Sequence, residues 1–116
     1  MAPVPLPWYC EDVNFDRKAA DNAVVSLRQL ERYVRSLAET RGNAAAEPYR
    51  DWSGRFADDF AREFHTTEEA LFGVADGIGR LVGRIHDGIE AAVTDQSTRL
   101  RLRASCTEPN CCHGHR

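Results

Sequence analysis

Apolar residues recur along most of the chain at alternating steps of three and four positions. In the first such segment these residues are Ala20, Ala23, Leu27, Leu30, Val34 and Leu37. Because these steps keep returning to one side of an α-helix, the spacing predicts a long amphipathic helix. We expect Asp12 or Asn14 to be its N-cap and Gly42 to follow its last residue. The helix is therefore placed at about residues 14–41.

The apolar pattern breaks over residues 42–54 and then resumes. Pro48 has no amide hydrogen and restricts Glu47, so this segment is expected to be a turn. A second helix is predicted over about residues 55–103. Its core seam is expected to comprise Phe56, Phe60, Phe64, Thr67, Leu71, Val74, Ile78, Leu81, Ile85, Ile89 and Ala92. Two long helices around a short break predict an all-α fold, a two-helix antiparallel hairpin spanning residues 13–103.

The second predicted helix has more apolar and small residues than one seam requires. At about 100° per residue, a further strip falls on its other side. This strip comprises Ala57, Ala61, Phe72, Ala75, Gly79, Val82 and Gly83. One hairpin cannot cover both strips, so we expect the hairpin to pair with another chain into a four-helix bundle. A kink or fraying of the helix at its glycines is the alternative.

Length, charge and hydropathy limit the classes of function. The 116 residues suit one small domain, and 18 acidic against 15 basic residues argue against nucleic acid as a partner. No stretch approaches the roughly 20 apolar residues that span a bilayer. Residues 1–12 are predicted to be an extended, proline-rich arm without the features of a secretory signal. The chain is therefore expected to be made in the cytoplasm without a classical signal peptide.

The cysteines are distributed unevenly, with Cys10 alone and the others in the tail at residues 104–116. This distribution does not resemble a disulfide framework and suits a reducing cytoplasm. The tail combines thiols and imidazoles, the ligands that zinc or copper prefers, at Cys106, Cys111, Cys112, His113 and His115. It has no C-x-x-C pair, so we expect a flexible tail with no metal or cofactor and keep a metal site as the weaker alternative. Arg99, Arg101 and Arg103 are interpreted as cations favoured by the helix dipole.

A Trp-X-Gly tripeptide, Trp52-Ser53-Gly54, lies in the predicted turn, and Phe60 follows it by eight positions. Gly54 can adopt backbone angles that reverse the chain, and Trp52 can cover the open end of the hairpin. Over residues 13–103 this arrangement resembles the WXG-100 (ESAT-like) family of type VII secretion substrates. The start of the first helix, Val13-Asn14-Phe15-Asp16, also resembles actinobacterial members of that family.

The resemblance implies a helical hairpin that pairs with itself or with a second WXG-type chain and interacts with type VII secretion machinery. It implies that Trp52, Gly54 and Phe60 form the turn and recognition motif. The family's export signal, Tyr-X-X-X-Asp/Glu beyond the second helix, is absent, because Tyr9, Tyr33 and Tyr49 all precede the tripeptide. This absence fits a subunit exported with a signal-bearing partner, or a relative that stays in the cytoplasm.

No arrangement typical of a catalytic site is found, so the leading hypothesis is a non-catalytic, dimerising hairpin. Its hairpin and dimer packing is assigned to Leu27, Leu30, Val34, Leu37, Phe56, Phe64, Leu71, Phe72, Val74, Ile78, Leu81, Val82 and Ile85. Two alternatives remain. One is a membrane-active effector that uses the glycine-rich amphipathic residues 70–93, which the acidic character disfavours. The other is a small metal-binding protein centred on the tail.

Overall fold

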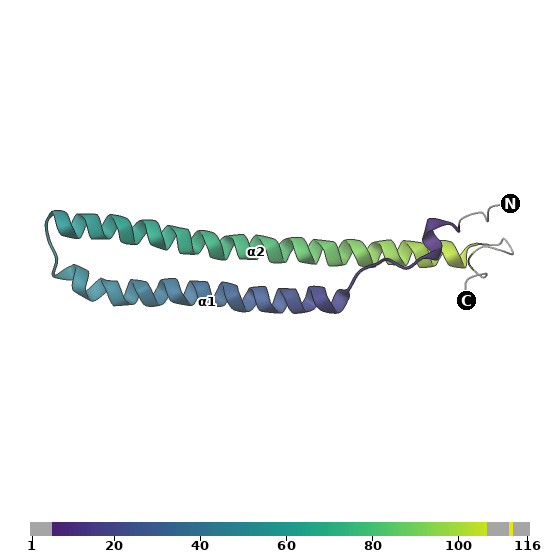
Figure 1. Ribbon diagram of the computed structural model, residues 1–116, viewed down its shortest axis with the longest axis horizontal. Coiled ribbons are helices and arrows are strands. Elements are labelled where there is room, and N and C mark those ends of the chain that lie inside the picture. The colour runs from purple at the N-terminus through teal and green to yellow at the C-terminus, as the bar shows by residue number, and fades with distance from the viewer. Residues whose placement is uncertain (1–5, 107–111, 113–116) are drawn as a thin grey trace.

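The computed structural model describes residues 6–106 and Cys112, and every regular element in that part of the chain is helical (Figure 1). A single 3₁₀ turn, η1, spans Trp8–Cys10, and two long helices follow, α1 at Arg17–Arg50 and α2 at Arg55–Ala104. The two helices run antiparallel, and the 3₁₀ turn η1 lies beside the C-terminal end of α2 (Figure 1). The predicted all-α hairpin is confirmed.

Helix α1 begins later than predicted. Its N-cap is Asp16, whose carboxylate accepts a hydrogen bond of 2.9 Å from the Ala19 amide. The assignment of the cap to Asp12 or Asn14 was wrong. Residues 11–15 are not helical and belong to the N-terminal arm, which we define as residues 6–16. The arm lies along the end of α2 before the chain enters α1 (Figure 1). The Asp12 carboxylate is engaged by side chains of α2 and so does not cap α1.

Helix α1 also ends later than predicted, at Arg50, and residues 42–50 are helical where a turn was expected. Gly42 keeps a negative φ, and Gly54 is the glycine with a positive φ in the described chain. The run of alanines after Asn43 favours helix strongly enough to carry the chain through Pro48. Because Pro48 lies in the last turn, it removes one backbone hydrogen bond only. The connection to α2 is correspondingly short.

Helix α2 is one continuous α-helix of 50 residues, close to the predicted bounds. Its glycines lie within it without interrupting it, so the kinked or frayed alternative is wrong. Its N-cap is Gly54, and the first turn carries Asp58, which is favourable at the positive end of the helix dipole. The last turn carries Arg101 and Arg103 at the negative end.

The core between the two helices is thin and consists of apolar side chains only. The buried residues of the described chain are Val34, Ala38, Ala57, Ala75, Ile78, Val82 and Ile89. Val34, Ile78 and Ile89 were expected in the seam. Ala57, Ala75 and Val82 were assigned to the outer strip, and that assignment was wrong because they face α1.

The seam of α2 differs from the prediction by one residue at several positions. Phe56, Val74 and Leu81 are 70%, 54% and 45% exposed, while the residue after each of them is buried. One residue corresponds to about 100° of rotation, so these three side chains leave the contact with α1. The smaller side chains of Ala57, Ala75 and Val82 lie at the contact instead, which lets the two helices approach closely. Apolar side chains flank the contact line, and periodicity alone therefore left the rotation of α2 ambiguous.

The molecule is a rod of 85 × 23 × 19 Å with a Cα radius of gyration of 26.2 Å. Its accessible surface is 9136 Å². A compact monomer of this mass exposes about 6300 Å² by the usual scaling of surface with mass. The hairpin thus leaves far more surface in contact with solvent than a globular chain of its size.

Candidate functional site

The Trp-X-Gly tripeptide forms the turn between the helices. Gly54 has φ 84° and ψ −164°, angles that residues with a Cβ rarely adopt. The Trp52 ring contacts Phe60 and Phe56 edge to face, with ring centroids 4.9 and 5.4 Å apart. The structure therefore brings the three predicted motif residues together, while Trp52 stays 38% exposed. Their role in recognition stays a prediction.

The aromatic cluster continues from the turn along the inner side of the hairpin. Tyr49 of α1 stacks on Phe60 at 6.3 Å, and Phe60 stacks on Phe64 at 5.9 Å. The Arg41 guanidinium lies 5.2 Å from the centre of the Phe64 ring and pairs with Glu68 at 3.3 Å. These contacts fasten the end of α1 to α2. They offer packing and recognition surface, with no nucleophile and base placed together.

Four large apolar residues of the two helices are exposed although they lie beside the seam. They are Leu30 at 47%, Leu37 at 38%, Val74 at 54% and Leu81 at 45% exposure. The Arg35–Asp76 ion pair, at 3.0 Å, shows which residues of the two helices lie at the same level. Leu30 lies five residues before Arg35 and Leu81 five after Asp76, while Leu37 and Val74 are each two residues from the pair. Because the helices are antiparallel, Leu30 is level with Leu81, and Leu37 is level with Val74.

These four residues also share one side of the hairpin. On each helix, these residues are rotated about the helix axis in the same sense from the buried residues, when the rotation is followed from the N-terminus to the C-terminus. In an antiparallel pair, rotations of the same sense place side chains on the same side of the pair. We call Leu30, Leu37, Val74 and Leu81 the apolar face. Arg35 and the Glu31 carboxylate that it also contacts, at 3.4 Å, are rotated the other way. One side of the rod is therefore apolar and the other carries an ion-pair network.

The residues predicted to pack divide into two groups. Leu27, Leu71, Val34, Ile78 and Val82 are buried or packed on the core, and Phe64 and Ile85 are half-buried. Leu30, Leu37, Phe56, Phe72, Val74 and Leu81 are exposed. Except for Phe56, which contacts Trp52 in the turn, the second group is the part of the predicted packing that stays exposed on the single hairpin.

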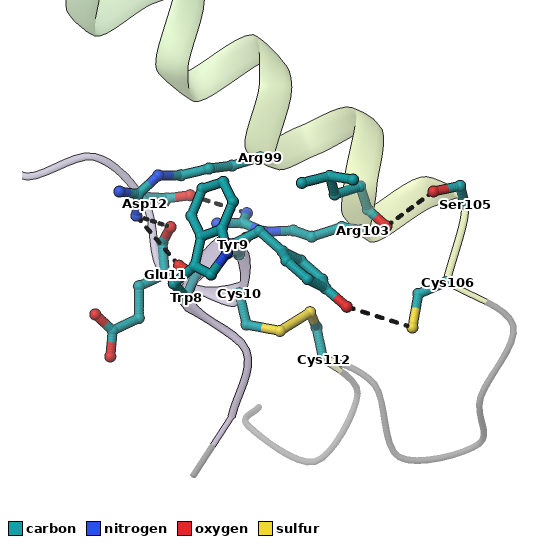
Figure 2. The surroundings of a disulfide bond; sticks show 11 residues. Trp8, Tyr9, Cys10, Glu11, Asp12, Arg99, Arg103, Ser105, Cys106 and Cys112 are labelled. Atoms are coloured by element: carbon teal, nitrogen blue, oxygen red, sulfur yellow. Dashed lines mark hydrogen bonds and ion pairs between the residues drawn. A yellow bond between two sulfur atoms is a disulfide. The ribbon is translucent and has the colours of Figure 1, made fainter.

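A further site lies where the N-terminal arm meets the last turns of α2, shown in Figure 2. Arg99 donates hydrogen bonds to the carbonyl oxygens of Trp8 and Glu11, at 3.3 and 2.8 Å. Arg103 donates to the Tyr9 carbonyl at 2.6 Å. The interpretation of Arg99 and Arg103 as helix-dipole cations missed this contact, because nothing in the local pattern shows where the arm lies.

Side chains add a second layer to the arm contact. The Asp12 carboxylate lies 2.9 Å from Arg103 and accepts a hydrogen bond of 2.9 Å from Gln96. The Gln96 carbonyl in turn accepts from the Val13 amide at 2.8 Å. The hydrogen bonds from Gln96 and Arg103 hold the pKa of the Asp12 carboxyl below its ordinary value. The Trp8 ring lies under the Arg99 guanidinium, 5.3 Å from its centre.

A disulfide between Cys10 and Cys112 closes this site, with 5.4 Å between the two Cα atoms (Figure 2). Cys106 is also disulfide-bonded, and it accepts a long hydrogen bond from the Tyr9 hydroxyl at 3.9 Å. The interpretation of the cysteines as a set without a disulfide framework was wrong. An antiparallel hairpin brings its two ends together, so the predicted fold already implied that Cys10 would meet the tail.

The disulfides also bear on the weaker metal alternative. Cys106 and Cys112 are oxidised here, and a metal is bound by thiolates. Cys111, His113 and His115 lie outside the described residues. In the described part of the chain, no three His, Cys, Asp or Glu side chains gather as a metal would require.

Two further findings concern the chain as a whole. In the part that the structure describes, neither helix has a stretch long and apolar enough to cross a membrane. Comparison with protein-family models, curated proteins and solved structures finds no match to this chain.

Proposed function

We propose that this protein is a non-catalytic helical hairpin that pairs with a second hairpin through its apolar face. The partner is a second copy or another WXG-type chain, and the pair is a substrate or subunit of a type VII secretion system. The Trp52-Ser53-Gly54 turn between two long helices supports the family resemblance.

The observation that carries the proposal is the apolar face itself. Leu30, Leu37, Val74 and Leu81 expose 38–54% of their surface on a rod with a core only one side chain deep. Burial of apolar surface contributes about 25 cal/mol per Å², so covering this face against a second rod is favourable. A pairing of two such rods gives each hairpin a second layer of core, as in a four-helix bundle.

The disulfides support a destination outside the reducing cytoplasm. Disulfides persist in secreted proteins and are rare in cytosolic ones. Cys10, Cys106 and Cys112 are all disulfide-bonded in the structure. Export as a folded pair by a type VII system is the route that we assign to the protein on this basis.

The pairing is tested by Leu81→Asp, which places a charge in the apolar face. We expect the mass measured by light scattering to fall from that of a pair to that of one chain, because an unpaired charge is costly to bury. Thr94→Asp is the control, since Thr94 lies on α2 and is exposed. It introduces the same charge away from the apolar face and is expected to leave the mass unchanged.

Circular dichroism of both variants separates loss of pairing from loss of helix. A parent chain that is monomeric at all concentrations, alone and mixed with a second WXG-type chain, contradicts the proposal. Binding of the parent chain to liposomes at neutral pH favours the membrane-active alternative.

The export step is tested in a host with an active type VII system. We expect the parent chain to be secreted by this host and no longer secreted when the system is deleted.

A further inference from the structure

The stripe of α2 that faces α1 changes character near its C-terminal end. It is apolar at Ile85, Ile89 and Ala92 and becomes polar at Gln96, Arg99 and Arg103, which continue the same helical spacing. The change occurs beyond Arg17, the first residue of α1, where the N-terminal arm lies against α2 instead (Figure 1). This polar end of the stripe is thus matched to an extended chain and not to a helix.

The polar stripe contacts the arm mainly through its backbone. Arg99 and Arg103 donate to three main-chain carbonyl oxygens, those of Trp8, Tyr9 and Glu11. Gln96 accepts from the Val13 amide, and Arg103 and Gln96 both contact the Asp12 carboxylate. A surface of this kind recognises an extended segment with an acidic side chain in one position.

The arm does not use all the donors that the surface offers. Arg99 Nε and Arg103 Nη2 are buried and have no hydrogen-bond partner among the described residues. A buried guanidinium donor without an acceptor is costly, so a segment that supplied another acceptor here would gain binding energy. The polar contacts alone therefore hold the arm less tightly than the surface allows.

The Cys10–Cys112 disulfide supplies what the polar contacts lack. It joins the arm to a residue beyond α2, across 102 positions of sequence. A covalent tether keeps the arm beside the stripe at high effective concentration. Removal of the tether leaves docking to depend on the incompletely satisfied hydrogen bonds.

We propose that Gln96, Arg99 and Arg103 form a docking surface for an extended acidic segment, occupied by the chain's own arm while the Cys10–Cys112 disulfide is closed. Reduction of the disulfide releases the arm and opens the surface to another segment of the same chemistry. The proposal does not depend on the pairing through the apolar face.

The reductant is a dithiol. One of its thiolates attacks a sulfur of the Cys10–Cys112 bond and forms a mixed disulfide, and the other cysteine leaves as a thiolate. The second thiolate of the reductant displaces the remaining cysteine and closes its own disulfide. Two electrons pass to the protein, and two protons complete the thiols of Cys10 and Cys112.

Release of the arm is tested on the full chain labelled with 5-fluorotryptophan. The fluorine spectrum has one signal from Trp8 and one from Trp52, which a Trp52→Phe variant assigns. In the double variant Cys10→Ser/Cys112→Ser, we expect the Trp8 signal to move part of the way towards the position of a free arm peptide, because the arm then exchanges between docked and released states. The Trp52 signal should stay in place, because the hairpin turn is distant. A Trp8 signal that stays in its docked position overturns the redox part of the proposal.

The docking surface is tested with a labelled peptide of residues 6–15 carrying Cys10→Ser. The receptor is the full chain with Cys10→Ser, Cys112→Ser and Asp12→Asn, in which the chain's own arm is weakened. We expect the peptide to bind this receptor and not the oxidised parent. Adding Arg103→Gln should weaken binding about tenfold or more, because a charge-assisted contact is lost.

Arg101→Gln is the matched control in the same receptor, since Arg101 contacts Thr98 and none of the arm. It removes the same charge from the same turn and should leave the affinity for the peptide within about twofold, as expected for an exposed charge. Equal loss in both variants reduces the surface to unspecific charge attraction and overturns the proposal. Absence of binding to the receptor overturns it as well.

Discussion

At the scale of single residues, the turn depends on one glycine and one tryptophan. Gly54 supplies a backbone conformation with φ 84° that ends the connection and starts α2. Trp52 then lies against Phe56 and Phe60, one and two turns into the helix. The Gly54 backbone angle sets the direction in which the chain enters α2, and the packing of the Trp52 ring on α2 stabilises that direction.

We predict that Gly54→Ala lowers the free energy of unfolding by about 1–3 kcal/mol, the cost of a strained backbone conformation. Nothing lies within 4 Å of the added Cβ, so the loss is conformational and not a clash. Gly83→Ala is the control, because Gly83 is helical and equally unobstructed. It should raise stability by about 0.5–1 kcal/mol. Urea denaturation followed by circular dichroism measures both, and equal effects in both variants contradict the prediction.

The Asp12 carboxyl makes the arm contact sensitive to acid. Its pKa lies below the ordinary value of 3.8, chiefly through the hydrogen bond from Gln96 and then through Arg103. A lowered pKa in the folded chain means that the contact stabilises fully above the ordinary value and is lost as pH falls through the lowered one.

We predict that a carbon NMR titration of Asp12 has its midpoint below 3.8. Gln96→Ala should move the midpoint upward, because the largest cause of the lowered pKa is removed. Arg101→Gln should leave it in place, since Arg101 contacts Thr98 and none of the arm. A midpoint at or above the ordinary value in the parent chain would show that the Asp12 contact does not form in solution.

At the scale of helices, the presence of two long helices was predictable from the sequence, but the rotation of α2 about its own axis was not. Two periodic segments of this length have no other common structure, and the start of α2 was placed correctly. The rotation of α2 depends on whether Leu81 or Val82 faces α1, and both are apolar. The choice follows from contacts across the pair, such as Arg41–Glu68, which lie far apart in the sequence.

The end of α1 was missed for a related reason. Pro48 and Gly42 are each read as breakers, but a helix tolerates them when its neighbours favour helix and its face is packed. Ala45 is half-buried against α2 in this stretch. The arm contact was missed more completely, because Gln96 and Arg99 give no local sign of a partner more than eighty residues away.

We predict that Pro48→Ala stabilises the hairpin by about 1–2 kcal/mol. Alanine restores the hydrogen bond that proline cannot donate in the last turn, and the gain is reduced by the greater freedom of the unfolded chain. Glu47→Ala is the control and should change stability by no more than a few tenths of a kcal/mol, because both residues favour helix. A loss of stability in Pro48→Ala would mean that proline shapes the turn itself.

At the scale of the whole molecule, the rod shape sets how pairing can occur. The Cα radius of gyration, 26.2 Å, is about twice the roughly 13 Å expected for a compact domain of this length. The apolar face lies in the middle of the rod, at residues level with the Arg35–Asp76 pair. The arm contact lies at one end (Figure 1), and the Cys10–Cys112 disulfide belongs to the same site (Figure 2). Pairing through the middle therefore leaves the arm accessible.

This arrangement predicts that two chains associate side by side and not end to end. Small-angle X-ray scattering of the pair should show twice the mass of one chain, a thicker cross-section and a maximum dimension close to the 85 Å of the single rod. Chains joined through their arms or disulfides would extend well beyond that length. The Cys10→Ser/Cys112→Ser variant is the control, because it removes the disulfide at the end while leaving the apolar face intact. It should scatter as the same short, thick particle, and a doubled length in either sample would place the contact at the ends of the rod.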